Sequence, residues 1–262
     1  MLAGGTDLLV QMRADVVDPE LIVDIKKIAE TRAVSEEKGG WRIGAAVTGA
    51  ELKEHARLKK AWPGVVEPAN LIGSTQVQGR ATLGGNLCNG SPAADSVPAL
   101  IAAGAVATLA GPQGRRDLPV EDVMLGPRKL ALRKGEIVVS FLLPPRAPRS
   151  SDAYLRFIPR TEMDIAVVGA GVSLTLDGSG TISAARVSLG AVAARVLLVA
   201  EAAQAVIGSR LDEAAQRRLE AAARAVCRPI DDKRGTIEFR TDVAAVLTRR
   251  AALIALDRAR TS

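Results

Sequence analysis

With 262 residues, 48% of them hydrophobic and 24% charged, the chain is long enough to bury one large core or two modest ones. The net charge of +6 is spread over separated basic pairs, and two Trp, one Tyr and three Phe are too few for base stacking, so we expect no nucleic-acid binding. No apolar run approaches the ~18 residues of a membrane span. The first residues lack the basic region and the cleavage-site pattern of a secretory signal, so we expect none. Two cysteines are too few for a disulfide framework, and we therefore expect a cytoplasmic protein without a membrane span.

The first part of the chain predicts strands that alternate with helices. The continuous apolar run Leu21–Ile28 is typical of a buried strand of a parallel sheet. Thr48 and Glu51 form a capping-box pattern, which predicts a helix that continues to about Lys60. The other expected elements are a strand at Trp41–Val47, a helix at Pro63–Ile72, a helix followed by a strand within Pro98–Ala110, and a strand at Ile137–Leu143.

The segment PPRAPRSS, Pro144 to Ser151, is the strongest linker signal, and it predicts two domains with the boundaries 1–148 and 152–262. Beyond the linker, two strands are expected on either side of an Asp-Gly-Ser-Gly turn. The remainder is expected to be helical. These elements are the strands Ala166–Leu176 and Ile182–Leu189, the helices Arg195–Ile207 and Leu211–Cys227, and a last helix capped by Thr241.

Two segments place paired glycines beside hydroxyl and acidic residues: AGGTDLL (Ala3–Leu9) and TLGGNLCNGSPAAD (Thr82–Asp95). Without a Cβ, a glycine pair lets successive backbone amides form a concave, partly positive nest that suits a phosphate. Two nests on one ligand would match a diphosphate, which favours a dinucleotide. The GxxxxGK[ST] loop of nucleoside triphosphatases and the GxGxxG pattern of the Rossmann fold are both absent. The alternative is that both glycine pairs form simple tight turns.

These two segments resemble the FAD-contacting segments of the molybdenum hydroxylases, the family of xanthine dehydrogenase and carbon monoxide dehydrogenase. Two later segments, YLRFIPRTEMDIAVVGAGVSL (Tyr154–Leu174) and RPIDDKRGTIEFR (Arg228–Arg240), also resemble that family, so the resemblance covers essentially the whole chain. It implies an α+β fold in which a two-part, PCMH-type FAD-binding domain precedes a smaller C-terminal domain with an antiparallel sheet and helices. Relatives usually carry a further strand and helix before the first glycine turn, and we expect these to be missing here.

By position, the resemblance implies particular contacts with FAD. Asp95 would bind ribose hydroxyls, Arg156 would stabilise a reduced, anionic flavin, and Asp164 and Ile165 would lie near the isoalloxazine ring. Alternatively, Asp95 caps the helix that follows it, and Arg156 is an ordinary surface residue of a strand. Cys88 is expected to be a small buried residue. The full set of expected cofactor contacts is Leu2, Ala3, Gly4, Gly5, Thr6, Asp7, Leu8, Ile72, Thr82, Gly84, Gly85, Asn86, Asp95, Val138, Arg156, Asp164 and Ile165.

The resemblance implies the FAD-binding medium subunit of a molybdenum hydroxylase, assembled as a dimer of heterotrimers. A molybdopterin-binding large subunit would oxidise the substrate, and an iron–sulfur small subunit would pass electrons from its two-iron two-sulfur clusters to FAD. One histidine and two cysteines are too few to bind such clusters, so both other centres are expected on the partners. No catalytic residue or metal ligand is assigned, because the flavin carries the chemistry. The alternatives are a stand-alone FAD-dependent oxidoreductase and a non-enzymatic protein whose glycine turns are only structural.

Overall fold

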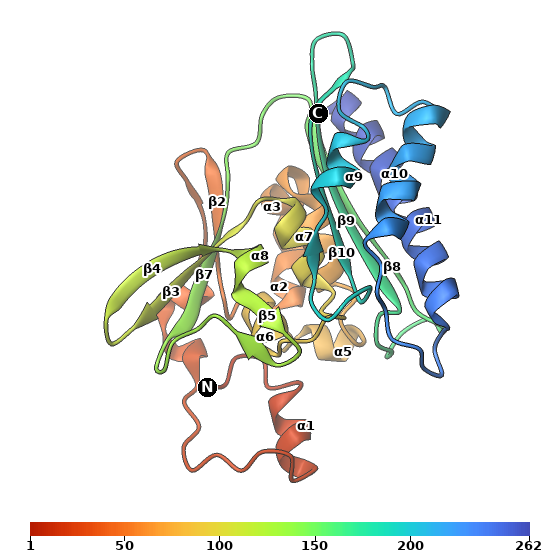
Figure 1. Cartoon of the computed structure of the whole chain (residues 1–262). Coiled ribbons are helices and arrows are strands. Elements are labelled where there is room, and N and C mark those ends of the chain that lie inside the picture. The colour runs from red at the N-terminus through yellow and green to blue at the C-terminus, as the bar shows by residue number, and fades with distance from the viewer.

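The computed structural model describes residues 1–262 and contains two main antiparallel sheets (Figure 1). The first sheet has the strand order β1-β2-β7-β3-β4. Its central strand, β7, is the predicted apolar run Ile137–Leu143 and pairs with both β2 and β3. The predicted strand at Trp41 is confirmed as β2, which ends at Gly44. The bounds of the other strands are Val34–Glu37 (β1), Gly40–Gly44 (β2), Val106–Gly111 (β3) and Gly114–Pro119 (β4).

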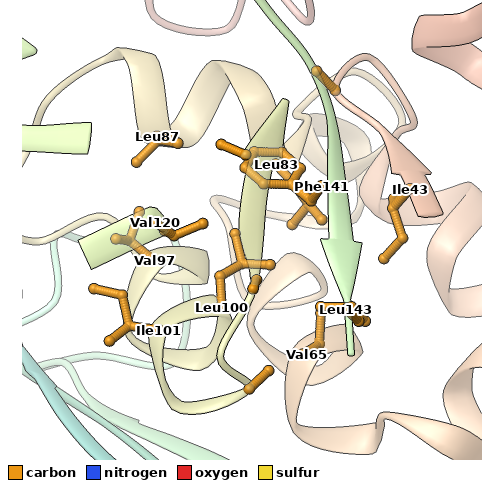
Figure 2. Close-up of a cluster of buried hydrophobic side chains, with 14 of the residues drawn as sticks. Ile43, Val65, Leu83, Leu87, Val97, Leu100, Ile101, Val120, Phe141 and Leu143 are labelled. Atoms are coloured by element: carbon orange, nitrogen blue, oxygen red, sulfur yellow. The ribbon is translucent and has the colours of Figure 1, made fainter. Parts of the chain in front are cut away.

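Short helices lie between the two sheets in Figure 1. Their apolar side chains form a buried core with the first sheet, in which Leu83, Leu100 and Phe141 are almost completely closed to solvent (Figure 2). The predicted helices near Pro63 and Pro98 are confirmed as α4 and α7. The helices of this part of the chain are α1 (Leu8–Arg13), α2 (Gly49–Glu54), α3 (Ala56–Ala61), α4 (Pro63–Ala69), α5 (Thr75–Gln78), α6 (Leu83–Cys88), α7 (Ser96–Ala102) and α8 (Val120–Val123).

The second sheet has the strand order β11-β10-β9-β8. Helices α4 and α7 pack on one side of it, and the long C-terminal helix α11 packs against β8 and β9. The predicted strands on either side of the Asp-Gly-Ser-Gly turn are confirmed as β9 and β10. The elements are β8 (Ser150–Phe157), β9 (Val168–Leu176), β10 (Ile182–Gly190), β11 (Leu197–Leu198), α9 (Ala200–Gln204), α10 (Glu213–Ala225) and α11 (Ile237–Thr261), and a small sheet pairs β5 (Met124–Gly126) with β6 (Lys129–Leu130).

The predicted buried strand Leu21–Ile28 is wrong. Leu21 is 75% exposed, and within this run only Ile25 is buried. Its one bridge joins Asp24 to Leu2, through hydrogen bonds from Leu2 N to Val23 O and from Ile25 N to Leu2 O. A 3₁₀ turn, Ile25–Lys27, then ends the extended segment. An apolar run alone does not make a strand, because a strand also needs neighbours for its backbone groups.

Three predicted helices also differ from the structure. The helix expected to reach Lys60 divides at His55, whose Nδ1 accepts a hydrogen bond from Leu58 N and so caps a second helix. The last helix is capped by Thr236, because Thr241 lies within the helix and donates to Ile237 O. The segment expected as a helix from Arg195 contains β11 before the short helix α9. None of the helices combines the length and apolar composition that crossing a membrane requires.

Candidate functional site

A cavity of about 340 Å³ lies where the first glycine turn meets α6 and β7. Its wall is apolar on the β7 side, with Leu130, Leu132 and Val138, and is formed by the two glycine segments on the other side. The predicted residues that line it are Ala3, Gly4, Gly5, Thr6, Asp7, Leu8, Ile72, Thr82, Gly84, Gly85, Asn86 and Val138. The structure therefore brings together two segments that are separated by more than seventy positions in the sequence.

The first glycine turn presents four successive backbone amides that donate to no backbone carbonyl, those of Gly4, Gly5, Thr6 and Asp7. Gly5 has a φ of +82°, a backbone angle that residues other than glycine rarely adopt. A Cβ on Gly4 would lie 2.1 Å from the carbonyl oxygen of Arg80, so only glycine permits this approach. Unpaired amides in such a turn are the donors of an anion-binding nest.

The second glycine segment is built differently. Thr82 caps α6, and its Oγ1 accepts a hydrogen bond from Gly85 N over 3.0 Å. Gly84 N donates to Ala45 O, and Asn86 N donates to Thr82 O. The amides of Gly84, Gly85 and Asn86 therefore bond to the protein and are not free donors like those of the first turn. Gly84 is also required for packing, since a Cβ there would lie 2.6 Å from Ala45 O.

Asp95 and Arg156 do not line the cavity. Asp95 Oδ2 accepts a hydrogen bond from Arg156 Nη1 over 2.8 Å, and its Oδ1 accepts one from the Tyr154 hydroxyl over 3.1 Å. Burial raises the pKa of Asp95 to about 6, and the nearby Arg156 opposes this shift. In the structure, the Asp95 carboxylate thus contacts protein groups rather than the cavity.

Both alternative readings of this pair are wrong. The Asp95 side chain does not cap α7. Instead, Asn86 Oδ1 accepts hydrogen bonds from the backbone nitrogen of Ser96 and from its hydroxyl, over 3.0 and 2.7 Å. Arg156 is not a surface residue, because only 6% of its side chain is exposed. The Asn86 amide thus holds the start of α7 while the residue lines the cavity.

The remaining predicted contacts, Leu2, Asp164 and Ile165, also lie outside the cavity lining. Asp164 accepts a hydrogen bond from Arg234 over 2.8 Å, which lowers the pKa of Asp164 to about 2. Ile165 is 56% exposed. The backbone nitrogen of Met163, in the same loop, donates to Gly73 O, next to the cavity residue Ile72. The loop therefore lies beside one end of the cavity without forming its wall.

Several cavity residues were not predicted from the sequence. Cys88 is exposed rather than buried and lines the cavity with Asn89. Both lie one helical turn after Gly85, on the same face of α6. Helical spacing from Gly85 would therefore have predicted them as cavity residues. Glu136 lies at the β7 end, where hydrogen bonds from Arg116 lower its pKa to about 2. The other unpredicted residues are Met1, Gln11, Ile25, Ala45, Ala81, Leu130, Leu132 and Ile137.

Known proteins share both parts of this chain. The family model of the FAD binding domain in molybdopterin dehydrogenase matches residues 1–146, and that of the CO dehydrogenase flavoprotein C-terminal domain matches residues 153–255. The chain is 32% identical to the carbon monoxide dehydrogenase medium chain of Hydrogenophaga pseudoflava, over 96% of this chain and 87% of that protein. It is 31% identical to the xanthine dehydrogenase FAD-binding subunit of Escherichia coli O157:H7, over 95% of this chain and 86% of that protein.

Solved structures have the same fold. The cyanide-inactivated Cu,Mo-CO dehydrogenase contains a chain that matches with a TM-score of 0.94 and 33% identity, over 98% of this chain and 89% of that chain. Quinoline 2-oxidoreductase from Pseudomonas putida 86 matches with a TM-score of 0.88 and 29% identity, with the same coverage. These matches confirm the predicted α+β fold with its FAD-binding and C-terminal parts. The chain therefore belongs to the family of FAD-binding domains of molybdopterin dehydrogenases.

Proposed function

We propose that this chain is the FAD-binding medium subunit of a molybdenum hydroxylase, which passes electrons from a partner's iron–sulfur clusters through FAD to an external acceptor. The observation that carries the proposal is the row of four free amides at Gly4–Asp7, which faces the same cavity as the capped start of α6. Successive backbone amides of this kind suit the diphosphate of a dinucleotide. The family to which the chain belongs supports FAD as that dinucleotide.

The residues present fit FAD in two respects. The free amides of the first glycine turn would hold the diphosphate, and the apolar wall with Leu130, Leu132 and Val138 would contact the flat, apolar part of the cofactor. When bound, FAD supplies the electron-transfer chemistry, and the protein supplies binding and orientation. The chain's own residues exclude water from one side of the cavity and fix its shape. No side chain is assigned as an acid or a base.

The proposed assembly places the other redox centres on partner chains. One histidine and two cysteines supply too few ligands for an iron–sulfur cluster. We therefore propose a molybdopterin-binding large subunit and an iron–sulfur small subunit as partners, in a dimer of heterotrimers. The names of the relatives, a medium chain of carbon monoxide dehydrogenase and an FAD-binding subunit of xanthine dehydrogenase, support this arrangement. The proposed location is the cytoplasm.

The test is FAD binding by the purified chain, measured by quenching of flavin fluorescence. In the Gly5→Val variant, the added Cβ would lie 2.9 Å from Leu2 Cδ1 at a φ of +82°, so the turn must change shape. Gly208→Val is the matched control, since Gly208 has a φ of +81° and no atom within 4 Å of an added Cβ. We expect Gly5→Val to weaken FAD binding by about a hundredfold, the effect of losing two or more amide contacts, and Gly208→Val to leave it unchanged.

Other outcomes separate the alternatives. Equal FAD affinity in the two variants would contradict the proposed site. Turnover of an organic substrate by the isolated chain would favour a stand-alone oxidoreductase. Stoichiometric iron on the isolated chain would contradict the placement of the clusters on a partner.

A further inference from the structure

The carbonyl groups of four residues at the start of the first glycine turn, Leu2 to Gly5, are bonded to protein, whereas the backbone amides of Gly4 to Asp7 are not. Leu2 O accepts a hydrogen bond from Ile25 N over 3.1 Å, and Gly5 O accepts one from Leu9 N over 3.0 Å. Gly4 O accepts a longer one from Arg80 Nε over 3.4 Å. Ala3 O accepts a hydrogen bond from Lys26 Nζ over 2.7 Å. These four carbonyls thus point to the protein, while the amides of Gly4 to Asp7 stay free to bind a ligand.

The position of the Lys26 ammonium group is fixed by more than its contact with Ala3 O. Its Nζ also contacts Asp24 Oδ1 over 2.8 Å, and the same carboxylate oxygen accepts a hydrogen bond from the backbone nitrogen of Lys26 over 2.9 Å. Its side chain is 19% exposed. Lys26 does not line the cavity, so it acts on the turn from behind.

The position of the Ala3 carbonyl determines that of the next amide. Ala3 C=O and Gly4 N–H belong to one planar peptide unit and point in opposite directions. A cation bonded to the carbonyl therefore fixes the orientation of the Gly4 N–H, one of the free amides of the turn. It also polarises the peptide group, which makes that N–H a stronger donor.

We propose that Lys26 is a positioning residue for the diphosphate, since it orients the peptide plane between Ala3 and Gly4 and places a positive charge behind the first glycine turn. This inference rests on the proposed FAD site and adds a residue to it. Lys26 is not expected to contact the cofactor. Its effect is transmitted through the Ala3 carbonyl.

The test compares three ligands that share different parts of FAD. ADP contains the diphosphate without the flavin, riboflavin contains the flavin without the diphosphate, and FAD contains both. Lys26→Met removes the cation, and Lys27→Met is the matched control, because Lys27 is the exposed neighbour. We expect Lys26→Met to weaken FAD and ADP binding by about tenfold to a hundredfold, the range of a hydrogen bond to a charged group, and to leave riboflavin binding unchanged. Lys27→Met should bind all three ligands as the wild type does.

Two further variants complete the experiment. Lys26→Arg keeps a cation near Ala3 O and should recover most of the ADP affinity. Asp24→Asn leaves Lys26 in place but removes its charged neighbour, and should weaken ADP binding less than Lys26→Met. Wild-type ADP affinity in Lys26→Met, or an equal loss for ADP and riboflavin, would overturn the proposed role of Lys26. Absence of FAD binding by the wild-type chain would instead overturn the proposed function itself.

Discussion

Arg156 donates a hydrogen bond to Asp95 over 2.8 Å, and this contact joins β8 of the second sheet to the residue that precedes α7. Only 6% of the Arg156 side chain and 9% of the Asp95 side chain are exposed. Tyr154, also on β8, adds a hydrogen bond from its hydroxyl to the same carboxylate. A buried carboxylate is stable in its charged form only when it is paired. The ion pair between Asp95 and Arg156 therefore links the two parts of the chain.

The first prediction concerns the pH dependence of stability in the Arg156→Met variant. The pKa of Asp95 is about 6 in the folded chain, above its ordinary value of 3.8. The folded state therefore binds this proton more tightly than the unfolded state, and ionisation of Asp95 lowers stability as the pH rises from about 4 to above 6. Removal of Arg156 raises this pKa further and extends the loss to higher pH. At pH 7.5 we expect a loss of about 3–5 kcal/mol, the cost of an unpaired buried charge, and a smaller loss at pH 5.

Urea denaturation at pH 5 and pH 7.5 measures this difference. Arg160→Met is the control, because Arg160 is 65% exposed and its removal should cost little at either pH. Replacing Asp95 by Asn in the Arg156→Met background should recover part of the stability at pH 7.5. An equal loss at both pH values in Arg156→Met would show that Asp95 is not the group that responds.

The second prediction concerns the segment that connects the two sheets. Arg146 donates to Asp152 over 2.7 Å, and its guanidinium carbon lies 3.7 Å from the centre of the Trp62 ring. Asp152 is buried, and burial raises its pKa. We expect Arg146→Met to destabilise the chain by about 3–5 kcal/mol, because it leaves this carboxylate unpaired.

Arg146→Lys separates the two contacts of Arg146. It keeps the positive charge near Asp152 but loses the planar stacking on Trp62, so its cost should be smaller, about 1–2 kcal/mol. Thermal unfolding gives both values, and Arg250→Met, at an exposed position of α11, is the control. Equal losses in the Met and Lys variants would mean that stacking, and not the charge, provides the stability.

The third prediction concerns the packing of the second glycine segment. An alanine at position 84 would place its Cβ 2.6 Å from Ala45 O and 2.7 Å from Ala45 Cβ, so α6 must move. Overpacking of this kind costs about 1–3 kcal/mol. Gly79→Ala is the matched control, because its Cβ would meet only Gln76 O, at 3.6 Å. Calorimetric melting should show a lower midpoint for Gly84→Ala and no decrease for Gly79→Ala; equal midpoints would contradict the packing role of Gly84.

Much of the fold could be predicted because local patterns and tertiary contacts agree. The apolar strand β7 and the capping box at Thr48 were both read correctly, since each depends on neighbouring residues in the sequence. The prediction for Leu21–Ile28 is wrong because all of its hydrophobic residues except Ile25 are left exposed by the other elements, a property that no local pattern records. The end of the helix at His55 depends on one side chain, whose ring accepts a backbone hydrogen bond.

The candidate site was predictable to the extent that glycines determine backbone shape. Gly4 and Gly5 were identified because close approach and positive φ require glycine. The resemblance predicts that Asp95 binds ribose hydroxyls, whereas in the structure its carboxylate pairs with Arg156, a contact that depends on how two distant segments pack. The amides of Gly4 and Gly5 are free, whereas those of Gly84 and Gly85 are bonded to protein. The sequence could not predict this difference, because both segments contain the same Gly-Gly pair.

The last prediction concerns the capping box of α2. Thr48 Oγ1 accepts a hydrogen bond from Glu51 N, and a Glu51 carboxylate oxygen accepts one from Thr48 N over 2.8 Å. Thr48→Ala removes the side-chain acceptor and should destabilise the chain by about 1 kcal/mol, the usual value for an N-cap. Thr48→Ser keeps the hydroxyl and should retain most of the stability.

Chemical denaturation of the two Thr48 variants tests this difference, with FAD affinity measured in parallel. Thr48 lies beside Thr82, with which it forms an isolated antiparallel bridge, but it is not part of the cavity wall. The free amides of Gly4–Asp7 do not depend on the capping box, so Thr48→Ala should lower stability and leave FAD affinity within about twofold of the wild type. A large loss of affinity in Thr48→Ala would mean that α6, which begins at Leu83, moves with the start of α2 and contributes more to cofactor binding than its bonded amides indicate.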